Sequence, residues 1–293
     1  MGHLFQFYVV QSLFSFLSLL PLSLSGWIVK RAGDLFFCCS SKRRKTALAN
    51  LAIVYGDTIS ITQKRKIARK CFENGALSIL DLFLIRKIKK SASSRFTMVG
   101  KSYFEEAFSR GKGVVFVASH LGSWEYIAFA GYLSQTPRAV IVKNLKNKYL
   151  NKKIDALRRE IDSVPIPKVN AIRQTLTELR QNHGVGVLID QWAGGDGIWI
   201  DFFGVATSTT SLPARIAKKT GCALIPIYCI RKEVGRYDIQ VLPEVHLPDG
   251  PDWEFQTTKR LNEILESQIR RYPEQWSWGH RRWKRKPLTT RAA

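Results

Sequence analysis

Apolar and polar residues alternate along the chain with a period that changes from that of a helix to that of a strand. Short apolar runs predict buried β-strands at 113–119, 138–142, 184–189, 222–230 and 237–242. Apolar residues at spacings of three and four, together with cap residues, predict helices over 46–90, 121–134, 147–161, 170–182, 210–221 and 254–272. Strands that alternate with helices indicate an α/β fold, with a mixed, largely parallel sheet flanked by helices.

The first 30 residues form a separate apolar block. No charged residue occurs from Leu4 to Val29, and a run of roughly 20 apolar residues is enough to span a bilayer. A spanning helix, which Pro21 weakens, and a helix lying in one leaflet are both open. A cleaved signal peptide is disfavoured because no positively charged leader precedes the run. We expect a membrane anchor helix over 1–30 and a single domain over 31–293.

The charge balance points to anionic partners. The chain has 46 Lys and Arg against 23 Asp and Glu, a net charge of +23, and such a surface attracts polyanions. No nucleic-acid-binding motif accompanies the basic clusters, so no nucleic-acid partner is expected and anionic lipid is favoured. Lys30, Arg31 and residues 42–45 follow the apolar block and place the rest of the chain on the cytoplasmic side of the membrane.

Polar side chains follow two of the predicted strands directly. His120 comes after the strand at 113–119, and Asp190 and Gln191 come after the strand at 184–189. Ligands of parallel α/β sheets bind outside the carboxyl ends of the strands. We therefore expect these side chains to meet at one edge of the sheet and to form a site there.

The segment "SHLGSWE" (119–125) places a glutamate five residues after that histidine. His120 can act as a general base near neutral pH if a carboxylate holds its other ring nitrogen, and Glu125 is the candidate. The backbone N–H groups of Gly122 and Ser123 are candidates to bind a developing oxyanion. No nucleophile elbow is present, which favours direct attack by an acceptor hydroxyl on an activated acyl carbonyl. The alternative is a strand and a helix with two incidental polar residues.

"SHLGSWE" resembles the His-x4-Asp/Glu block of the glycerolipid acyltransferase superfamily, in the form typical of the bacterial lipid A late acyltransferases (lauroyl and myristoyl transferases). Four further blocks are similar to that family and occur in its order. They are "RKTALANL" (44–51), "VKNLKNKYLNKKIDALR" (142–158), "GVGVLIDQWAGGDGIWIDFFG" (184–204) and "YPEQWSWGHRRWKRKP" (272–287). Three positions depart from its pattern: Ser123 stands in place of Asn, Lys143 in place of Arg, and Lys148 in place of Pro.

The resemblance implies an O-acyltransferase of the bacterial inner membrane that adds a fatty acyl chain to a hydroxyl of a lipid A precursor in lipopolysaccharide biosynthesis. It implies His120 as the base and Glu125 as its partner, with an acyl carrier protein thioester, or acyl-CoA, as the donor. Another membrane lipid acceptor, such as a phosphatidylinositol mannoside or a lysophospholipid, stays open. A more distant alternative is a non-catalytic basic protein that binds membranes or nucleic acid. The expected substrate-binding residues are Leu121, Gly122, Ser123, Trp124, Lys143, Lys146, Asn147, Asp190, Gln191 and Arg215.

No cofactor is implied beyond the donor, and no metal site is expected. The other histidines lack partners at metal-ligand spacing, and Cys222 and Cys229 lie in an apolar run typical of core. The tryptophans and arginines of 276–283 suit a membrane interface or, in a nucleic-acid binder, a base-stacking surface, and the resemblance favours the former. Structural packing of the tryptophans is expected in either case. Acyl-chain length, the acyl position modified and the oligomeric state are not determined by the sequence.

Overall fold

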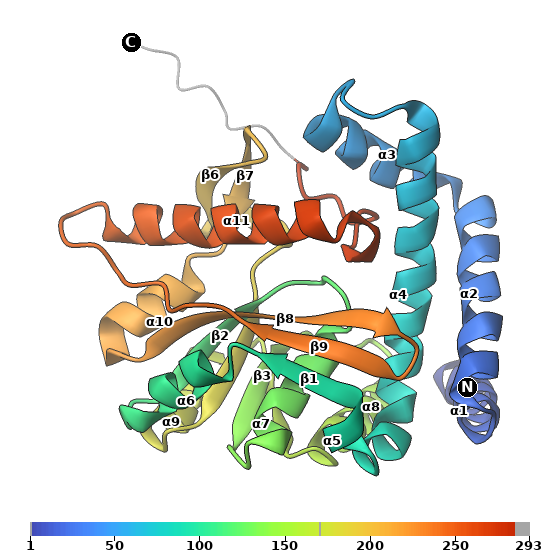
Figure 1. Cartoon of the computed structure of the whole chain (residues 1–293), viewed down its shortest axis with the longest axis horizontal. Helices are drawn as coiled ribbons and strands as arrows, with labels where there is room; N and C mark the ends of the chain where they lie inside the picture. Colours follow the sequence, from blue (N-terminus) through green and yellow to red (C-terminus); the bar gives the residue numbers. More distant parts are fainter. Residues whose placement is uncertain (1, 170, 285–293) are drawn as a thin grey trace.

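The computed structural model describes residues 2–169 and 171–284 and contains a central seven-stranded sheet (Figure 1). All neighbouring strands are parallel except β8 and β9, which confirms the predicted mixed, largely parallel sheet flanked by helices. In spatial order the strands are β1 (Phe96–Val99), β9 (Arg236–Val241), β8 (Ala223–Glu233), β2 (Val114–Ala118), β5 (Gly184–Leu188), β3 (Arg138–Val142) and β4 (Ser163–Pro167).

Both faces of the sheet are buried, which is why its central strands read as continuous apolar runs. Alternate residues of β2 enter two different core clusters, Val114 and Phe116 in one and Val115 and Val117 in the other. The cluster with Phe116 is covered by α6 (Lys101–Ser109), α7 (Phe129–Leu133) and α8 (Lys148–Arg159). The cluster with Val115 is covered by α9 (Ala171–Arg180), α10 (Leu212–Thr220) and α11 (Trp253–Arg271).

Strands at the margins were not predicted from the apolar pattern. β4 carries Pro165 and Pro167, and proline is confined to edge strands because it cannot donate to the hydrogen-bond ladder. β1 has only four residues and forms the other edge. A separate hairpin of β6 (Ile198–Phe202) and β7 (Val205–Thr209) follows the short η2 (Gly194–Asp196).

Two helices replace the single anchor helix predicted over 1–30. α1 (Gly2–Leu19) and α2 (Leu22–Cys39) are separated at Pro21, which has no N–H group to continue a helix and precedes α2 as its N-cap residue. α1 exposes a series of large apolar side chains: Leu4, Phe5, Tyr8, Val9, Leu13, Phe16 and Leu19. Within the described ranges, no helix is both long and apolar enough to cross a membrane.

The predicted helical region 46–90 is divided into α3 (Ser41–Tyr55) and α4 (Ile61–Lys89), which precede the short α5 (Ala92–Arg95). Ser60 caps α4, because its hydroxyl accepts from the Gln63 N–H while the Gln63 side chain accepts from the Ser60 N–H. α4 packs against α1, α2, α3 and α8 and stands beside the sheet (Figure 1).

A buried ion pair joins α4 to the sheet. Asp81 on α4 accepts from the Arg231 guanidinium at 2.5 Å and from the Tyr237 hydroxyl at 2.9 Å. The side chains of Asp81 and Arg231 are only 2% and 4% exposed. Removal of one partner leaves the other charge buried without compensation, which is far more costly than loss of a surface pair.

Asp81→Ala should therefore lower the free energy of unfolding by about 3–5 kcal/mol. Urea denaturation of the variant and the parent protein measures the difference. Glu105→Ala is the control, because the Lys101–Glu105 pair has more than half of each side chain in solvent and is worth less than about 1 kcal/mol. Equal losses in the two variants would show that the buried pair does not hold α4 on the sheet.

Candidate active site

The register of β2 and β5 brings His120 and Asp190 together. Ala118 is paired with Leu188 in this parallel ladder, and each polar residue follows two positions later. His120 Nδ1 lies 2.9 Å from Asp190 Oδ1, and the His120 backbone N–H donates to Asp190 Oδ2 at 3.0 Å. The structure thus confirms that the two strand ends direct these side chains to one edge of the sheet.

Asp190 is a buried carboxylate with three hydrogen-bond donors. Its side chain is 2% exposed, and its third donor is the Trp276 indole N–H, 2.9 Å from Oδ2. Burial alone would raise the pKa of Asp190, but the charge of His120 and these hydrogen bonds hold the pKa below its usual value. The carboxylate therefore stays ionised and accepts the Nδ1 proton of His120.

Two opposing effects act on the imidazole. Burial disfavours the charged ring, but the charge of Asp190 and its hydrogen bond outweigh burial and raise the pKa of His120 above 6.5. Because Asp190 accepts at Nδ1, the lone pair of the neutral tautomer is on Nε2, 3.4 Å from the Gln191 amide nitrogen. The side chain is 25% exposed, and it lines the main cavity of the described residues. A base is thus presented to this cavity.

Glu125 does not hold the imidazole. Its carboxylate accepts two hydrogen bonds from the Arg158 guanidinium, at 2.7 and 3.0 Å. The chain turns into the 3-10 helix η1 (Trp124–Ala128) after Ser123, which directs Glu125 to α8 instead of to His120. A bidentate guanidinium is a strong partner for a carboxylate. The predicted contact is therefore wrong, and a catalytic role for Glu125 stays a prediction.

The backbone donors predicted to bind an oxyanion are already in use. The Gly122 N–H donates to the Gln275 carbonyl at 3.0 Å, and the Ser123 N–H donates to the Cys229 carbonyl at 2.8 Å. Gly122 has a φ of 65°, and a Cβ there would collide with the Cys229 carbonyl oxygen. The glycine thus serves a close approach between this loop and β8, and neither N–H is available to a substrate.

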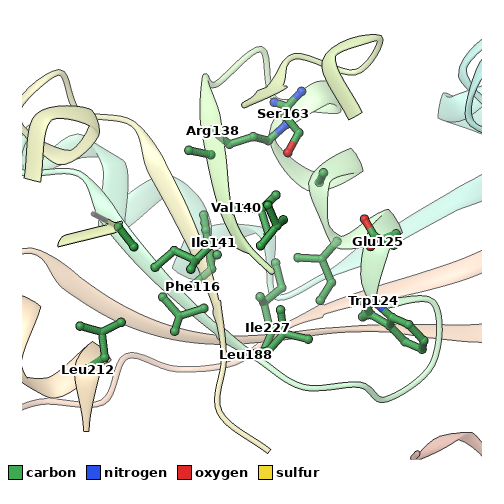
Figure 2. Close-up of a pocket in the computed structure, with 18 of the residues that line it drawn as sticks. Phe116, Trp124, Glu125, Arg138, Val140, Ile141, Ser163, Leu188, Leu212 and Ile227 are labelled. Carbon is green, nitrogen blue, oxygen red and sulfur yellow. The ribbon is translucent and has the colours of Figure 1, made fainter. Parts of the chain in front are cut away.

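A cavity of about 630 Å³ opens beside His120. Its lining comes from β2, β3 and β5 and from η1, α7, α9 and α10. Val140 and Ile141, which are adjacent in β3, point to opposite faces of the sheet, and both line the cavity (Figure 2). The cavity therefore wraps around the carboxyl ends of the strands and is large enough for a sizeable organic ligand.

The cavity contains some of the predicted substrate-binding residues and not others. Trp124, whose ring lies 5.1 Å from that of His120, lines it together with Lys143, Gln191 and Arg215. The Gln191 amide nitrogen lies 3.4 Å from His120 Nε2. The residues that are not among the lining residues are Leu121, Gly122, Ser123, Lys146, Asn147 and Asp190, whose buried carboxylate reaches the cavity only through His120.

The reasons for these absences are structural. Leu121 and Ser123 are almost completely buried, and Lys146 is exposed away from the cavity. Asn147 is the N-cap of α8: its side-chain oxygen accepts from the N–H groups of Tyr149 and Leu150, and its amide donates to the His3 carbonyl. A capping role accounts for Asn147.

The C-terminal segment 273–283, which begins with η3 (Pro273–Gln275), supports the site in a way that the sequence reasoning missed. Arg282, fully buried, donates to the carbonyls of Gln191 and Ser208. The Asn50 amide of α3 donates to the carbonyls of Trp278 and His280. Trp276, Trp278 and Arg282 therefore belong to the core. This confirms the expected packing for these two tryptophans, whereas a membrane interface is wrong for Arg282. Their only signal in the sequence is the block at 272–287.

Asp190→Asn should lower the pKa of His120. The variant loses the negative charge that raises this pKa and keeps only a neutral amide oxygen as acceptor, while burial, which lowers the pKa, remains. The pKa is then expected below its ordinary value of about 6.5. The ring of the variant therefore stays neutral at a lower pH than the ring of the parent protein.

NMR titration of the His120 ring protons measures this pKa. Glu125→Gln is the matched carboxylate control, because Glu125 makes no hydrogen bond to the ring and its charge acts on the ring more weakly than that of Asp190. A larger fall in Glu125→Gln than in Asp190→Asn would contradict the assignment of Asp190 as the partner of His120.

Comparison with known proteins shows the family of the chain. The family model for bacterial lipid A biosynthesis acyltransferases matches residues 2–285. A lipid A biosynthesis acyltransferase of Haemophilus influenzae is 24% identical over 269 residues, 89% of this chain and 82% of the relative. The lipid A biosynthesis palmitoleoyltransferase of Escherichia coli is 23% identical over 273 residues, 92% of this chain and 88% of the relative. A phosphatidylinositol mannoside acyltransferase of Mycolicibacterium smegmatis is 25% identical over 181 residues, 60% of this chain and 59% of the relative. The chain belongs to the bacterial lipid A biosynthesis acyltransferase family.

Proposed function

We propose that the protein transfers a fatty acyl chain from an acyl carrier protein thioester to a hydroxyl group of a lipid A precursor. The observation that carries this proposal is the His120–Asp190 pair, which presents an imidazole to a large, mostly apolar cavity. Membership of an acyltransferase family supports acyl transfer as the reaction.

The proposed reaction uses His120 as base and then as acid. His120 Nε2 takes the proton of the acceptor hydroxyl, whose oxygen attacks the thioester carbonyl carbon. The tetrahedral intermediate collapses, the C–S bond breaks, and the imidazolium returns its proton to the thiolate that leaves. The products are an ester and a free thiol. Asp190 stabilises the imidazolium throughout, because it stays ionised and hydrogen-bonded to Nδ1.

Side chains take the place of the backbone donors first expected to stabilise the oxyanion. The Gln191 amide, 3.4 Å from His120 Nε2, is within reach of an oxyanion that forms beside the base. Lys143 and Arg215 line the cavity and are exposed, which suits contact with the phosphate groups of an acceptor. Arg158, which neutralises Glu125 at the cavity wall, prevents a second free carboxylate from repelling such phosphates.

The charge of the protein supports an acidic donor. A net charge of +23 favours association with an acidic carrier protein and with anionic lipid by the same long-range attraction. Acyl-CoA carries negative charge as well and is the alternative donor. Neither donor needs a further cofactor in the proposed reaction.

A second acceptor class has a specific observation in its favour. The relative from Mycolicibacterium smegmatis is named a phosphatidylinositol mannoside acyltransferase and is 25% identical over its matched part. Lipid A relatives match a larger share of the chain, 87% or more. A lipid A precursor is therefore the acceptor that we propose, with a phosphoinositol lipid as the second candidate.

His120→Ala and Asp190→Asn should each reduce acyl transfer by about 10²–10⁴-fold, the usual contribution of a general base. The assay incubates purified protein with a tetra-acylated, bisphosphorylated lipid A precursor and acyl carrier protein thioesters, and mass spectrometry detects the added acyl group. His183→Ala is the matched control, because His183 forms a similar pair with Glu178 at 2.8 Å but does not line the cavity.

Two results would contradict the proposal in different ways. Full activity of His120→Ala would exclude His120 as the base. If the folded parent protein adds no acyl group to the lipid A precursor but acylates a phosphatidylinositol mannoside, the second acceptor is the correct one.

Attachment to the cytoplasmic face of the bacterial inner membrane is part of the proposed function. The exposed apolar side chains of α1 and of α2, where Leu24, Trp27, Leu35 and Phe36 are exposed, suit insertion between lipid headgroups. Lys30, Arg31 and the basic residues at 42–45 lie in the same part of the chain and favour anionic lipid.

Replacement of both Phe5 and Phe16 by Asp should weaken binding to anionic vesicles at least about tenfold, because two aromatic side chains no longer leave water. Vesicle flotation measures the bound fraction. Phe255→Asp on α11 is the control, because Phe255 is 42% exposed but lies on a different helix from the proposed membrane surface. Unchanged binding in the double variant would exclude α1 as the attachment site.

A further inference from the structure

Strand β5 carries two glycines on one face, Gly184 and Gly186, although it lies at the centre of the sheet between β2 and β3. Glycine weakens the interior of a strand and often marks the close approach of a ligand or another backbone. A Cβ at Gly184 would lie 2.7 Å from the Phe116 ring, so packing accounts for this position. A Cβ at Gly186 would meet nothing nearer than Val140 Cγ2 at 3.6 Å. These are ordinary van der Waals distances, so packing does not require glycine here, and the space that Gly186 borders belongs to the cavity beside His120.

That space is the part of the cavity that runs under η1 and α7. Phe116, Gly186 and Val140 are paired across β2, β5 and β3, so their side chains point to the same face of the sheet. We call this part the buried limb, and its lining includes Phe116, Ala118, Ile127, Val140, Gly186 and Leu188. All of these side chains are apolar or absent, and Glu125 and Arg158, which also line the cavity, are paired with each other.

The buried limb extends from the base to the far end of the strands. Arg138, which lines the cavity at that far end, is paired with Gly184, and Gly184 is paired with Val114. Val114 precedes His120 by six residues, which corresponds to about 20 Å of strand. Figure 2 shows Arg138 and Ser163 at one end of the pocket and Trp124 at the other, with Val140 between them. A long space with apolar walls fits an extended hydrocarbon chain.

The far end has a different chemistry. Arg138 is 7% exposed, its Nη1 donates to the Thr136 carbonyl and its Nη2 to the Ile161 carbonyl. Its Nε is buried with no acceptor, and burial lowers the pKa of the guanidinium to about 10. A Cβ at Gly131 would lie 2.6 Å from Nη1, so that α7 has room for this group only because residue 131 is glycine. The buried limb therefore ends at the Arg138 guanidinium, whose Nε–H has no acceptor among the described residues.

We propose that the buried limb holds the acyl chain of the donor and that Arg138 sets the longest chain that it accepts. Each methylene placed along the limb leaves water and strengthens binding. A methylene pressed against Arg138 covers a guanidinium that has an unpaired N–H, which is unfavourable. Affinity therefore rises with chain length and then falls sharply. This inference rests on the proposed acyl transfer for the identity of the donor.

The test uses the full chain and saturated fatty acids of increasing length, which displace a fluorescent fatty acid from the protein. Affinity should rise roughly fourfold per methylene up to a limiting length. Gly186→Val, whose side chain enters the limb, should move the limit to shorter chains. Arg138→Met, which removes the cation and keeps a long side chain, should move it to longer chains. Gly186→Ala serves if Gly186→Val does not fold.

Val185→Ala is the matched control on the same strand, because Val185 is buried on the opposite face and does not line the cavity. It should leave the limiting length unchanged. An unchanged limit in Gly186→Val or Gly186→Ala and in Arg138→Met, or the same shift in Val185→Ala, would overturn the proposal.

A transfer assay with mixed acyl carrier protein thioesters separates this inference from the proposed function. Acyl transfer whose product masses do not change in the Gly186 and Arg138 variants would leave the function intact and exclude the limb as the acyl site. Length-limited binding without any transfer would support the limb and contradict the proposed reaction.

Discussion

The buried carboxylate of Asp190 is the constraint on which the site depends. An ionised group in the interior is unfavourable unless it is fully hydrogen-bonded, and Asp190 has three donors from two segments: the His120 N–H, the His120 ring and the Trp276 indole. The parallel pairing of β2 with β5 provides the first two, and the C-terminal segment provides the third. The sheet, the base and the last described segment are thus held together by one side chain.

Regions far apart in the sequence meet around this carboxylate. The Arg282 guanidinium donates to the Gln191 carbonyl, and the Asn50 amide donates to two carbonyls of the C-terminal segment. The Ser277 N–H donates to the His120 carbonyl. These contacts explain why short blocks dispersed over the whole chain carried the family resemblance. Their residues act on one another and only partly on the substrate, since Trp278 and Arg282 are fully buried.

The sequence was sufficient to predict those features of the fold and the site that follow from the local pattern of residues. Apolar runs located the central strands, and the rule for strand ends brought His120 and Asp190 to one edge. It did not predict the features that depend on tertiary contacts. The partner of Glu125 depends on α8, which carries Arg158, and no spacing between the two residues indicates the pair. β4 was not predicted because it contains two prolines. Asn147 was predicted to bind substrate because asparagine is typical both of helix caps and of binding sites.

The position of Trp276 along the chain also bears on biosynthesis. β2 and β5 emerge from the ribosome well before the segment at 273–283, so His120 and Asp190 can pair while the indole that completes the carboxylate shell is still inside the exit tunnel. α3, which carries Asn50, is also synthesised long before the two carbonyls to which the Asn50 amide donates. Completion of the carboxylate's hydrogen bonding therefore has to follow synthesis of the segment at 273–283, which binds both α3 and the loop after β2.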